Sequence, residues 1–292
     1  IVRPAVDLTV IAGARYAWNN IWGNSLNYRL GATYHIGRGL STKVIYGTSY
    51  VPPAPAQLQQ EPVRVEGGIV GNPDLKSQKA STGEVELSYK PVSWFDVAVN
   101  GFYTKIDDRV EFVYAGTQLT ARNVVPSQTL GFEAEARVAR RSFFSTANVS
   151  YQRTTATRSP PLDPYWWHVL YDKSGAGGDR SLYHPMWMGH GEAGWSYERA
   201  HVQGAVRVSY VGARKSSMAN IMKNHTAYLL PSYVVLDLTV RSLELNLLRG
   251  QATVFSLHVN NLLDQREAEP GALGVDIPRL GRTWFLRASQ EF

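Results

Sequence analysis

The 292-residue sequence contains no cysteine. It therefore has no disulfide framework and no thiolate metal site, and it suits a compartment in which stray thiols would be oxidised. No apolar run approaches the roughly 18 residues that a spanning helix needs, which excludes a bundle of membrane helices. Lysine and arginine exceed aspartate and glutamate by 30 to 24, but they are spread along the chain without forming a patch. This distribution disfavours a nucleic-acid-binding protein.

Apolar and polar residues alternate over one segment of about ten residues after another, for example over residues 26–36, 95–105, 201–211 and 232–242. A period of two predicts β-strands with one apolar and one polar face. About twelve such strands can be counted. They are centred near Ala12, Leu30, Val44, Leu87, Val99, Phe132, Val149, Ala193, Val206, Leu236, Leu257 and Leu286. Long helical patterns are missing between them, which excludes architectures that alternate strands and helices.

The connections between these strands alternate between short and long. Residues 51–80, 107–125, 157–185, 214–230 and 263–279 form the long ones. This alternation is typical of outer-membrane barrels, which have short periplasmic turns and long extracellular loops. The polar face carries many charges, which a dry core could not hold but a water-filled lumen can. Aromatic residues near the strand ends fit two interfacial girdles. The pattern predicts an all-β, antiparallel transmembrane outer-membrane barrel.

Five segments follow one another in the order found in a known family: GNPDLKSQKASTGEVELSYKP, FYTKIDD, NVVPSQTLGFEAEARV, LPSYVVLDLTV and FSLHVNNLLDQRE, before a last strand that ends on Phe292. Together they resemble the C-terminal half of the barrel of TonB-dependent outer-membrane receptors, over nearly the whole chain. The resemblance implies that residues 1–292 supply about twelve strands of a barrel of about 22, without the plug domain and the TonB box. It also implies the outer membrane of a Gram-negative bacterium, and a transporter rather than an enzyme.

The resemblance implies a function and partners as well. The function would be TonB-dependent active uptake of a scarce ligand, with a ferric siderophore favoured over cobalamin, heme or glycans. Energy would come from the TonB complex through the missing plug, and no cofactor is expected. The partners would include outer-membrane lipid, lipopolysaccharide and the barrel-assembly machinery. That machinery would recognise the last strand, so Trp284, Leu286 and Phe292 are expected assembly determinants. A plain interfacial anchor is the alternative for Phe292.

Ligand-binding residues are expected in the extracellular loops. The best candidates lie in the loop of residues 157–185, with one more in the loop of residues 51–80: Tyr165, Trp166, Trp167, His168, Tyr171, Arg180, Tyr183 and Arg64. Aromatic faces beside cations suit planar anionic ligands such as ferric catecholates. The alternative is a loop that packs on itself or rests on lipopolysaccharide.

No metal site is expected. His35, His190 and His258 fall on the polar face, where a solvated lining is favoured over metal ligation. Asp107 and Asp108 sit where a strand leaves the membrane, and an exposed pair is favoured over a calcium site.

Two other classes remain open at this point. One is a complete small barrel that acts as a passive pore or an autotransporter translocator, and the other is an outer-membrane enzyme with a site at the barrel rim. A closed small barrel must pair residues 8–18 with residues 280–292, because unpaired backbone groups in lipid cost several kcal/mol each. A receptor portion would leave these two strands apart.

Overall fold

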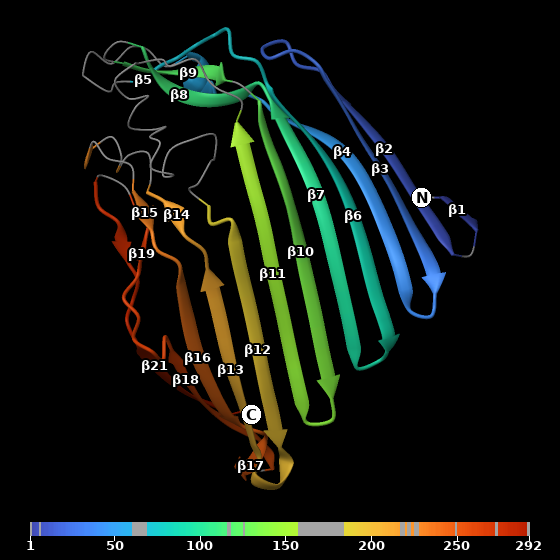
Figure 1. The fold of residues 1–292 in the computed structure, drawn as a ribbon, viewed down its shortest axis with the longest axis vertical. Helices are drawn as coiled ribbons and strands as arrows, with labels where there is room; N and C mark the ends of the chain where they lie inside the picture. Colours follow the sequence, from blue (N-terminus) through green and yellow to red (C-terminus); the bar gives the residue numbers. More distant parts are fainter. Residues whose placement is uncertain are drawn as a thin grey trace.

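The computed structural model describes residues 2–5, 7–59, 69–115, 118–124, 126–156, 184–216, 220, 223–224, 228–248, 250–271 and 274–290. Fourteen strands form one antiparallel sheet, which Figure 1 shows as a curved wall with short turns at its lower end and the longer connections at its upper end. The strands are β1 (Val2–Ala5), β2 (Leu8–Ala17), β3 (Ser25–Gly37), β4 (Leu40–Val51), β6 (Gln78–Val92), β7 (Phe95–Asp107), β10 (Ser127–Arg140), β11 (Phe143–Ala156), β12 (Trp187–Tyr197), β13 (Val202–Val211), β16 (Tyr233–Ser242), β17 (Leu245–Leu248), β18 (Gln251–Asn260) and β21 (Thr283–Gln290).

Each strand of this sheet pairs with the next one along the chain, except that β16 passes over the short β17 and pairs with β18. The order is β1-β2-β3-β4-β6-β7-β10-β11-β12-β13-β16-β18-β17, and β21 pairs with the other edge of β18. All twelve predicted strand centres fall in these strands, so the prediction of an antiparallel sheet is confirmed. The alternation did not reveal β1 and β17, which have only four residues each.

Several of the short turns need a backbone in the left-handed region. Arg38, Arg141 and His201 have φ angles of 53°, 55° and 51°. Gly39 has a φ of 82°, and a Cβ atom there would lie 2.6 Å from the carbonyl carbon of Lys90. Glycine is therefore required at this turn, both for its conformation and for the close approach of the next hairpin.

The sheet does not close on itself within the described residues. Its pairing order begins at β1 and ends at β17 and β21, and no ladder joins β2 to β21. Figure 1 places β2 and β21 at opposite sides of the wall. This open arrangement agrees with part of a receptor barrel and differs from the pairing that a closed small barrel requires.

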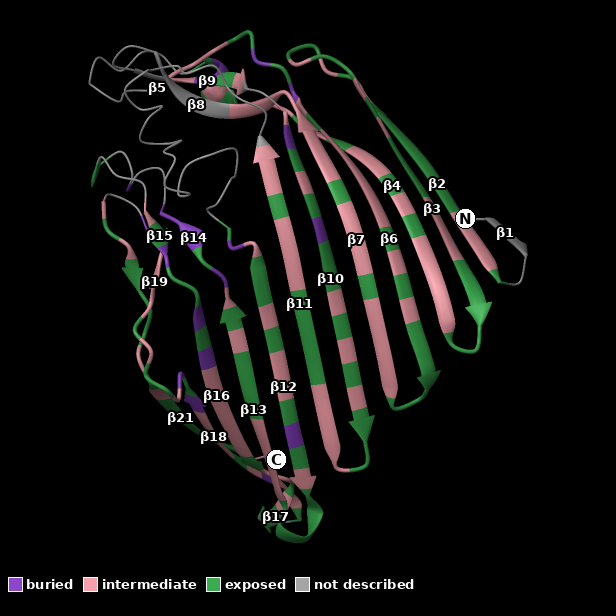
Figure 2. Cartoon of the chain, viewed as in Figure 1, coloured by how far each residue is buried: buried purple, intermediate pink, exposed green. Residues whose placement is uncertain are grey.

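The wall has almost no dry core. Large apolar side chains such as Leu30, Val85 and Leu130 are exposed on its outer face, and Figure 2 shows exposed and half-buried residues alternating along the strands. This is the surface that lipid covers in an outer-membrane barrel. Among the described residues, no helix is both long enough and apolar enough to span a membrane.

Ordered structure also occurs in the long connections, which the sequence predicts only as loops. The connection from β4 to β6 contains helix α1 (Pro55–Gln59) and β5 (Ile69–Val70), and the connection from β7 to β10 contains β8 (Arg109–Ala115) and β9 (Gln118–Val124). β5, β8 and β9 form a three-stranded sheet. Two small hairpins pair β14 (Arg214–Lys215) with β15 (Leu229–Leu230) and β19 (Ala268–Glu269) with β20 (Ile277–Pro278). The β14–β15 hairpin lies in the β13–β16 loop, and the β19–β20 hairpin lies in the β18–β21 loop.

Candidate functional site

The ligand-binding residues expected from the sequence lie outside the described residues. These are Tyr165, Trp166, Trp167, His168, Tyr171, Arg180, Tyr183 and Arg64, and Phe292 of the expected assembly signal lies outside as well. Trp284 and Leu286 are described, and both belong to β21, where they pair with Val259 and Leu257 of β18. They are 60% and 84% exposed, so they occupy the outer, apolar face of the last strand.

Aromatic side chains gather in two bands on the outer face. Near the long loops, Phe132, Tyr151 and Trp187 pack together, and the Tyr151 and Trp187 ring centroids are 4.7 Å apart. Near the short turns, Phe143 packs on Trp195 at 6.1 Å. Trp187 and Trp195 are eight residues apart on β12, or about 26 Å along the strand and about 20 Å in height at a tilt near 40°. The bands are therefore spaced like the two interfaces of a membrane.

The opposite, concave face carries ion pairs between neighbouring strands. Lys43 Nζ lies 2.7 Å from Glu86 Oε2, and Arg207 donates to Glu192 Oε2 through both Nε and Nη2, at 2.9 and 2.7 Å. A polar hollow of about 550 Å³ opens beside this second pair; it is lined by Phe144, Glu192, Gln203, Ala205, Arg207, Asp237, Thr239, Arg241, His258 and Asn260. Alternation along each strand thus separates a charged lumen face from the apolar outer face.

The three lumen histidines each hydrogen-bond a hydroxyl group on the neighbouring strand. His35 pairs with Ser41 at 3.0 Å, and His190 and His258 pair with Ser209 and Thr239 at 3.1 Å. Within the described part of the chain, no three His, Cys, Asp or Glu side chains are grouped in a way that could hold a metal ion.

The two neighbouring aspartates at the end of β7 make different contacts. Asp107 forms an ion pair with Lys105 at 2.8 Å, whereas Asp108 has a φ of 53° and offers its carbonyl oxygen to Asn123. The first contact lies at the end of β7, and the second lies at the start of the β7–β10 connection.

A buried arginine joins two long loops at the extracellular rim. The side chain of Arg214, in the β13–β16 loop, is 2% exposed. It donates from Nε to Glu269 Oε2 at 2.9 Å, from Nη1 to the carbonyl oxygen of Pro231 at 3.1 Å, and from Nη2 to the carbonyl oxygen of Ala268. Glu269 and Ala268 belong to the β18–β21 loop, so one side chain holds both loops and the start of β16. We call this group of contacts the Arg214 latch.

A second arginine, Arg279, completes the latch through Tyr233 and Glu269. Arg279 stacks over the Tyr233 ring at 4.8 Å and Arg214 stacks over it at 4.9 Å. Tyr233 donates its hydroxyl proton to Glu269 Oε1 at 2.5 Å. Burial alone would raise the pKa of Glu269, but hydrogen bonds from Tyr233, Arg214 and Arg279, together with the charge of Arg214, hold that pKa below its usual range. The carboxylate therefore stays ionised and keeps both guanidinium groups in place.

The same two loops meet again farther out. Asn220 is fully buried and donates from Nδ2 to Asp276 Oδ1 at 2.8 Å, while its Oδ1 accepts from the backbone N–H of Gly274 at 2.9 Å. Tyr228 donates to Asp276 Oδ2 at 2.7 Å. Burial and this hydrogen bond to a carboxylate raise the pKa of Tyr228, so the phenol stays protonated and donates. The β13–β16 and β18–β21 loops are thus joined at two levels.

The other pair of long connections is joined by apolar and amide contacts. Leu58 of α1, Leu75 and Ala121 of β9 form a small buried cluster. Asn72 donates from Nδ2 to the carbonyl oxygen of Ala121 at 2.9 Å. Asn123 accepts from the Lys76 backbone N–H at 2.8 Å and donates to the Lys76 carbonyl oxygen at 3.0 Å. Asn72 and Asn123 lie in two of the segments that carried the family resemblance, although the sequence alone gave no role to either amide.

Comparison with known proteins agrees with this architecture. A family model described as TonB dependent receptor-like, beta-barrel matches residues 2–262. The ferric-catecholate import receptor Fiu from K12 E. coli superposes with a TM-score of 0.70 at 20% identity, over 92% of this chain and 35% of that one. The ferric enterobactin receptor PfeA (G324V mutant) from Pseudomonas aeruginosa gives 0.70 at 15% identity, over 97% and 42% of the two chains. The FrpB iron transporter from Neisseria meningitidis (F5-1 variant, apoprotein form) gives 0.71 at 14%, over 97% and 43%.

The chain therefore spans less than half the length of these solved receptors. No curated protein sequence matches it. At these identities the superpositions show the fold, whereas the family model covers most of the chain. An antiparallel wall with two aromatic bands, a charged concave face and joined extracellular loops is consistent with that match. The chain belongs to the TonB-dependent receptor-like β-barrel family and to the outer membrane of a Gram-negative bacterium.

Proposed function

We propose that this chain forms part of the barrel of a receptor that takes up a ferric siderophore across the outer membrane, with energy supplied by the TonB complex. The observation that carries the proposal is the family match over residues 2–262. Support for the ligand class comes from the loop of residues 157–185, which is rich in aromatic and cationic residues. Ferric catecholate and ferric enterobactin receptors are also among the solved structures that share this fold.

In this proposal the loop of residues 157–185 supplies the first contacts with the ligand. Trp166 and Trp167 would stack on flat catecholate rings, and Arg180 would neutralise part of the negative charge of the complex. The joined connections on either side of this loop would keep the rim open. In this proposal the β13–β16 and β18–β21 loops move together, because the Arg214 latch connects them. The lumen wall would then receive the ligand from this rim.

The test is uptake of radioactive iron by cells that carry the full receptor and lack other siderophore receptors. We expect uptake of a ferric catecholate that depends on TonB. The double substitution Trp166→Ala and Trp167→Ala should raise the half-saturating concentration at least tenfold, as the loss of two stacking contacts implies. Trp195→Ala is the matched control, because this tryptophan lies in the membrane band near the short turns.

Three outcomes distinguish the alternatives. Uptake that continues without TonB would indicate a passive pore. TonB-dependent uptake of cobalamin or heme, with no response to iron complexes, would overturn the siderophore assignment and retain the receptor. Equal effects of the loop and control substitutions would exclude the aromatic loop as the binding surface.

A further inference from the structure

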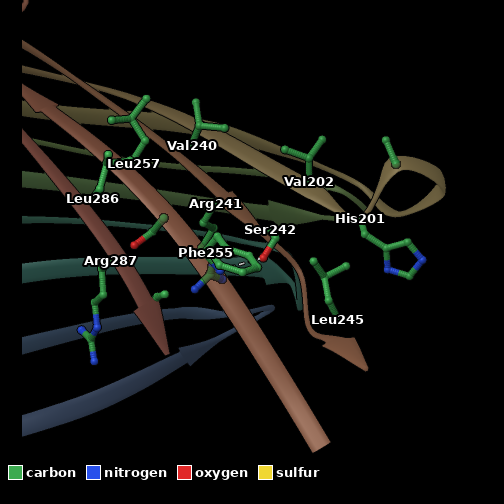
Figure 3. A pocket seen from close by; sticks show the side chains of 13 residues that line it. His201, Val202, Val240, Arg241, Ser242, Leu245, Phe255, Leu257, Leu286 and Arg287 are labelled. Atoms are coloured by element: carbon green, nitrogen blue, oxygen red, sulfur yellow. Dashed lines mark hydrogen bonds between the residues drawn. The ribbon is translucent and has the colours of Figure 1, made fainter. Parts of the chain in front are cut away.

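The outer face of the sheet has an apolar hollow near the short turns, with a volume of about 660 Å³. Val240, Leu257 and Leu286 occupy one row across β16, β18 and β21, since Val240 pairs with Leu257 and Leu257 with Leu286. Figure 3 shows these three side chains and Val202 projecting from the same side of the sheet, whereas Arg287 points away from it. The hollow therefore opens toward the membrane and not toward the lumen.

Small residues create the hollow. In the next row toward the periplasm, Phe255 pairs with Ala288, and Ser242 accepts a hydrogen bond from the Phe255 backbone N–H at 2.9 Å. A serine and an alanine beside the ring leave room that branched side chains would fill. Phe255 is 47% exposed and Leu286 is 84% exposed, so the described protein leaves this apolar surface uncovered.

The mouth of the hollow lies at the turn between β12 and β13. Ala200 and His201 of this turn line the hollow, and Arg199 precedes them in the short helix η1 (Glu198–Ala200). Both Arg199 and His201 are exposed. A guanidinium and an imidazole N–H at the end of an apolar hollow are donors suited to a phosphate group.

Basic residues recur at the neighbouring short turns. The four hairpin connections from β3 to β13, taken with the three strand residues on each side of them, carry five lysine or arginine residues, namely Arg38, Lys90, Arg140, Arg141 and Arg199. The same residues include two carboxylates, Asp96 and Glu198, and Asp7 and Glu244 lie in the two flanking connections. Arg140 also stacks over Trp94 at 4.9 Å, which fixes one of these cations at the level of the aromatic band. The excess of positive charge favours an anionic layer at this end.

We propose that the hollow binds one anionic phospholipid of the periplasmic leaflet. An acyl chain would lie across Phe255, Leu257 and Leu286, and the phosphate would accept hydrogen bonds from Arg199 and His201. The proposal depends on the membrane location of the chain and not on the ligand that the receptor transports. Lipopolysaccharide does not fit it, because the hollow lies at the end of the short turns, opposite the extracellular loops.

The test is native mass spectrometry of the intact receptor, purified from outer membranes in a mild detergent and supplied with phosphatidylglycerol or phosphatidylethanolamine. We expect one retained phosphatidylglycerol. Ala288→Leu fills the hollow and should lower retention several-fold, and Arg199→Gln should lower it about tenfold through loss of a charge-assisted contact. The matched controls are Ala147→Leu, at an exposed site on the outer face of β11, and Arg153→Gln, at an exposed site near the extracellular end.

Folding of each variant is checked by its heat-dependent migration in electrophoresis. Equal retention in Ala288→Leu and Ala147→Leu would overturn the proposal, as would equal retention in Arg199→Gln and Arg153→Gln. If Ala288→Leu does not fold, the Arg199 comparison decides alone. Equal retention of the two phospholipids would reject the anionic headgroup.

Discussion

Replacement of Arg214 by methionine tests whether the latch holds the two extracellular loops together. The substitution removes three hydrogen bonds and one stacking contact made by a buried cation. Breaking a buried ion pair costs about 3–5 kcal/mol. The remaining Glu269 side chain is 36% exposed and keeps Tyr233 and Arg279 as partners, so the lower figure applies. About 3 kcal/mol corresponds to a roughly 100-fold rise in the opening equilibrium of the loops.

Hydrogen exchange measures this opening directly. The Ser216 N–H bonds to the Tyr228 carbonyl oxygen at 3.0 Å, and the Arg279 N–H bonds to the Glu267 carbonyl oxygen at 2.9 Å. Both amides should exchange about 100-fold faster in Arg214→Met, while amides in the centres of β10 and β11 keep their rates. The loops would then open without unfolding of the wall.

Arg207→Met is the matched control for loss of a paired arginine. Arg207 also donates two hydrogen bonds to a carboxylate, but its side chain is 51% exposed. Exposed pairs contribute about 0–1 kcal/mol, so exchange near this site should rise less than about fivefold. If Arg214→Met and Arg207→Met change exchange equally, burial of Arg214 does not stabilise the loops and the reasoning is wrong.

Two further predictions concern the wall and the latch. Gly131→Ala would place a Cβ atom 2.5 Å from the Tyr151 carbonyl oxygen and 2.9 Å from Phe102 Cε1, so it should lower the free energy of urea unfolding by about 1–3 kcal/mol. A Cβ atom at Gly101 meets nothing within 4 Å, so Gly101→Ala should cost much less, and equal costs would contradict the steric account. Because the folded-state pKa of Glu269 is lowered, its contribution is present above the usual glutamate pKa of about 4.3 and is lost as the pH falls through the folded value. Protection of the loop amides, which compares the measured exchange with the intrinsic rate at each pH, should therefore fall between pH 6 and pH 3, and Glu269→Gln should remove that fall; a variant that keeps it would show that another group titrates.

The wall was predictable from sequence because its physics is local. A strand with lipid on one side and water on the other must alternate apolar and polar residues. The pattern of residues 233–242 therefore predicts a strand without any knowledge of its neighbours in the sheet. The long strands also pair in chain order, so the order of the sheet follows from the order of the sequence apart from the short β17. β1 and β17 were missed because four residues are too few to establish a period.

The joined loops were not predictable in this way. Arg214 and Glu269 are 55 residues apart, and Asn220 and Asp276 are 56 apart, with no periodic pattern around any of them. No sequence pattern predicts that the side chain of Arg214 is buried while that of Arg207, seven residues earlier, is exposed. The long connections looked like plain loops for the same reason, although α1 and β9 pack together there through Leu58 and Ala121.

The position of these contacts follows from the shape of the molecule. A barrel wall one strand thick has lipid outside and water inside, so it buries few side chains, such as Val235 and Val259, without a partner layer. Polar side chains are buried mainly where two connections rise beyond the membrane and cover each other, and there the backbone groups and charges must find partners. Most of the described buried polar residues lie in such connections, whereas Ser127 and Thr253 lie in β10 and β18; those in the connections are Ser77, Arg214, Lys215, Ser216, Asn220 and Asn261. The extracellular rim is therefore where this protein builds a specific three-dimensional core, and loops held by such contacts can present a binding surface without first having to become ordered.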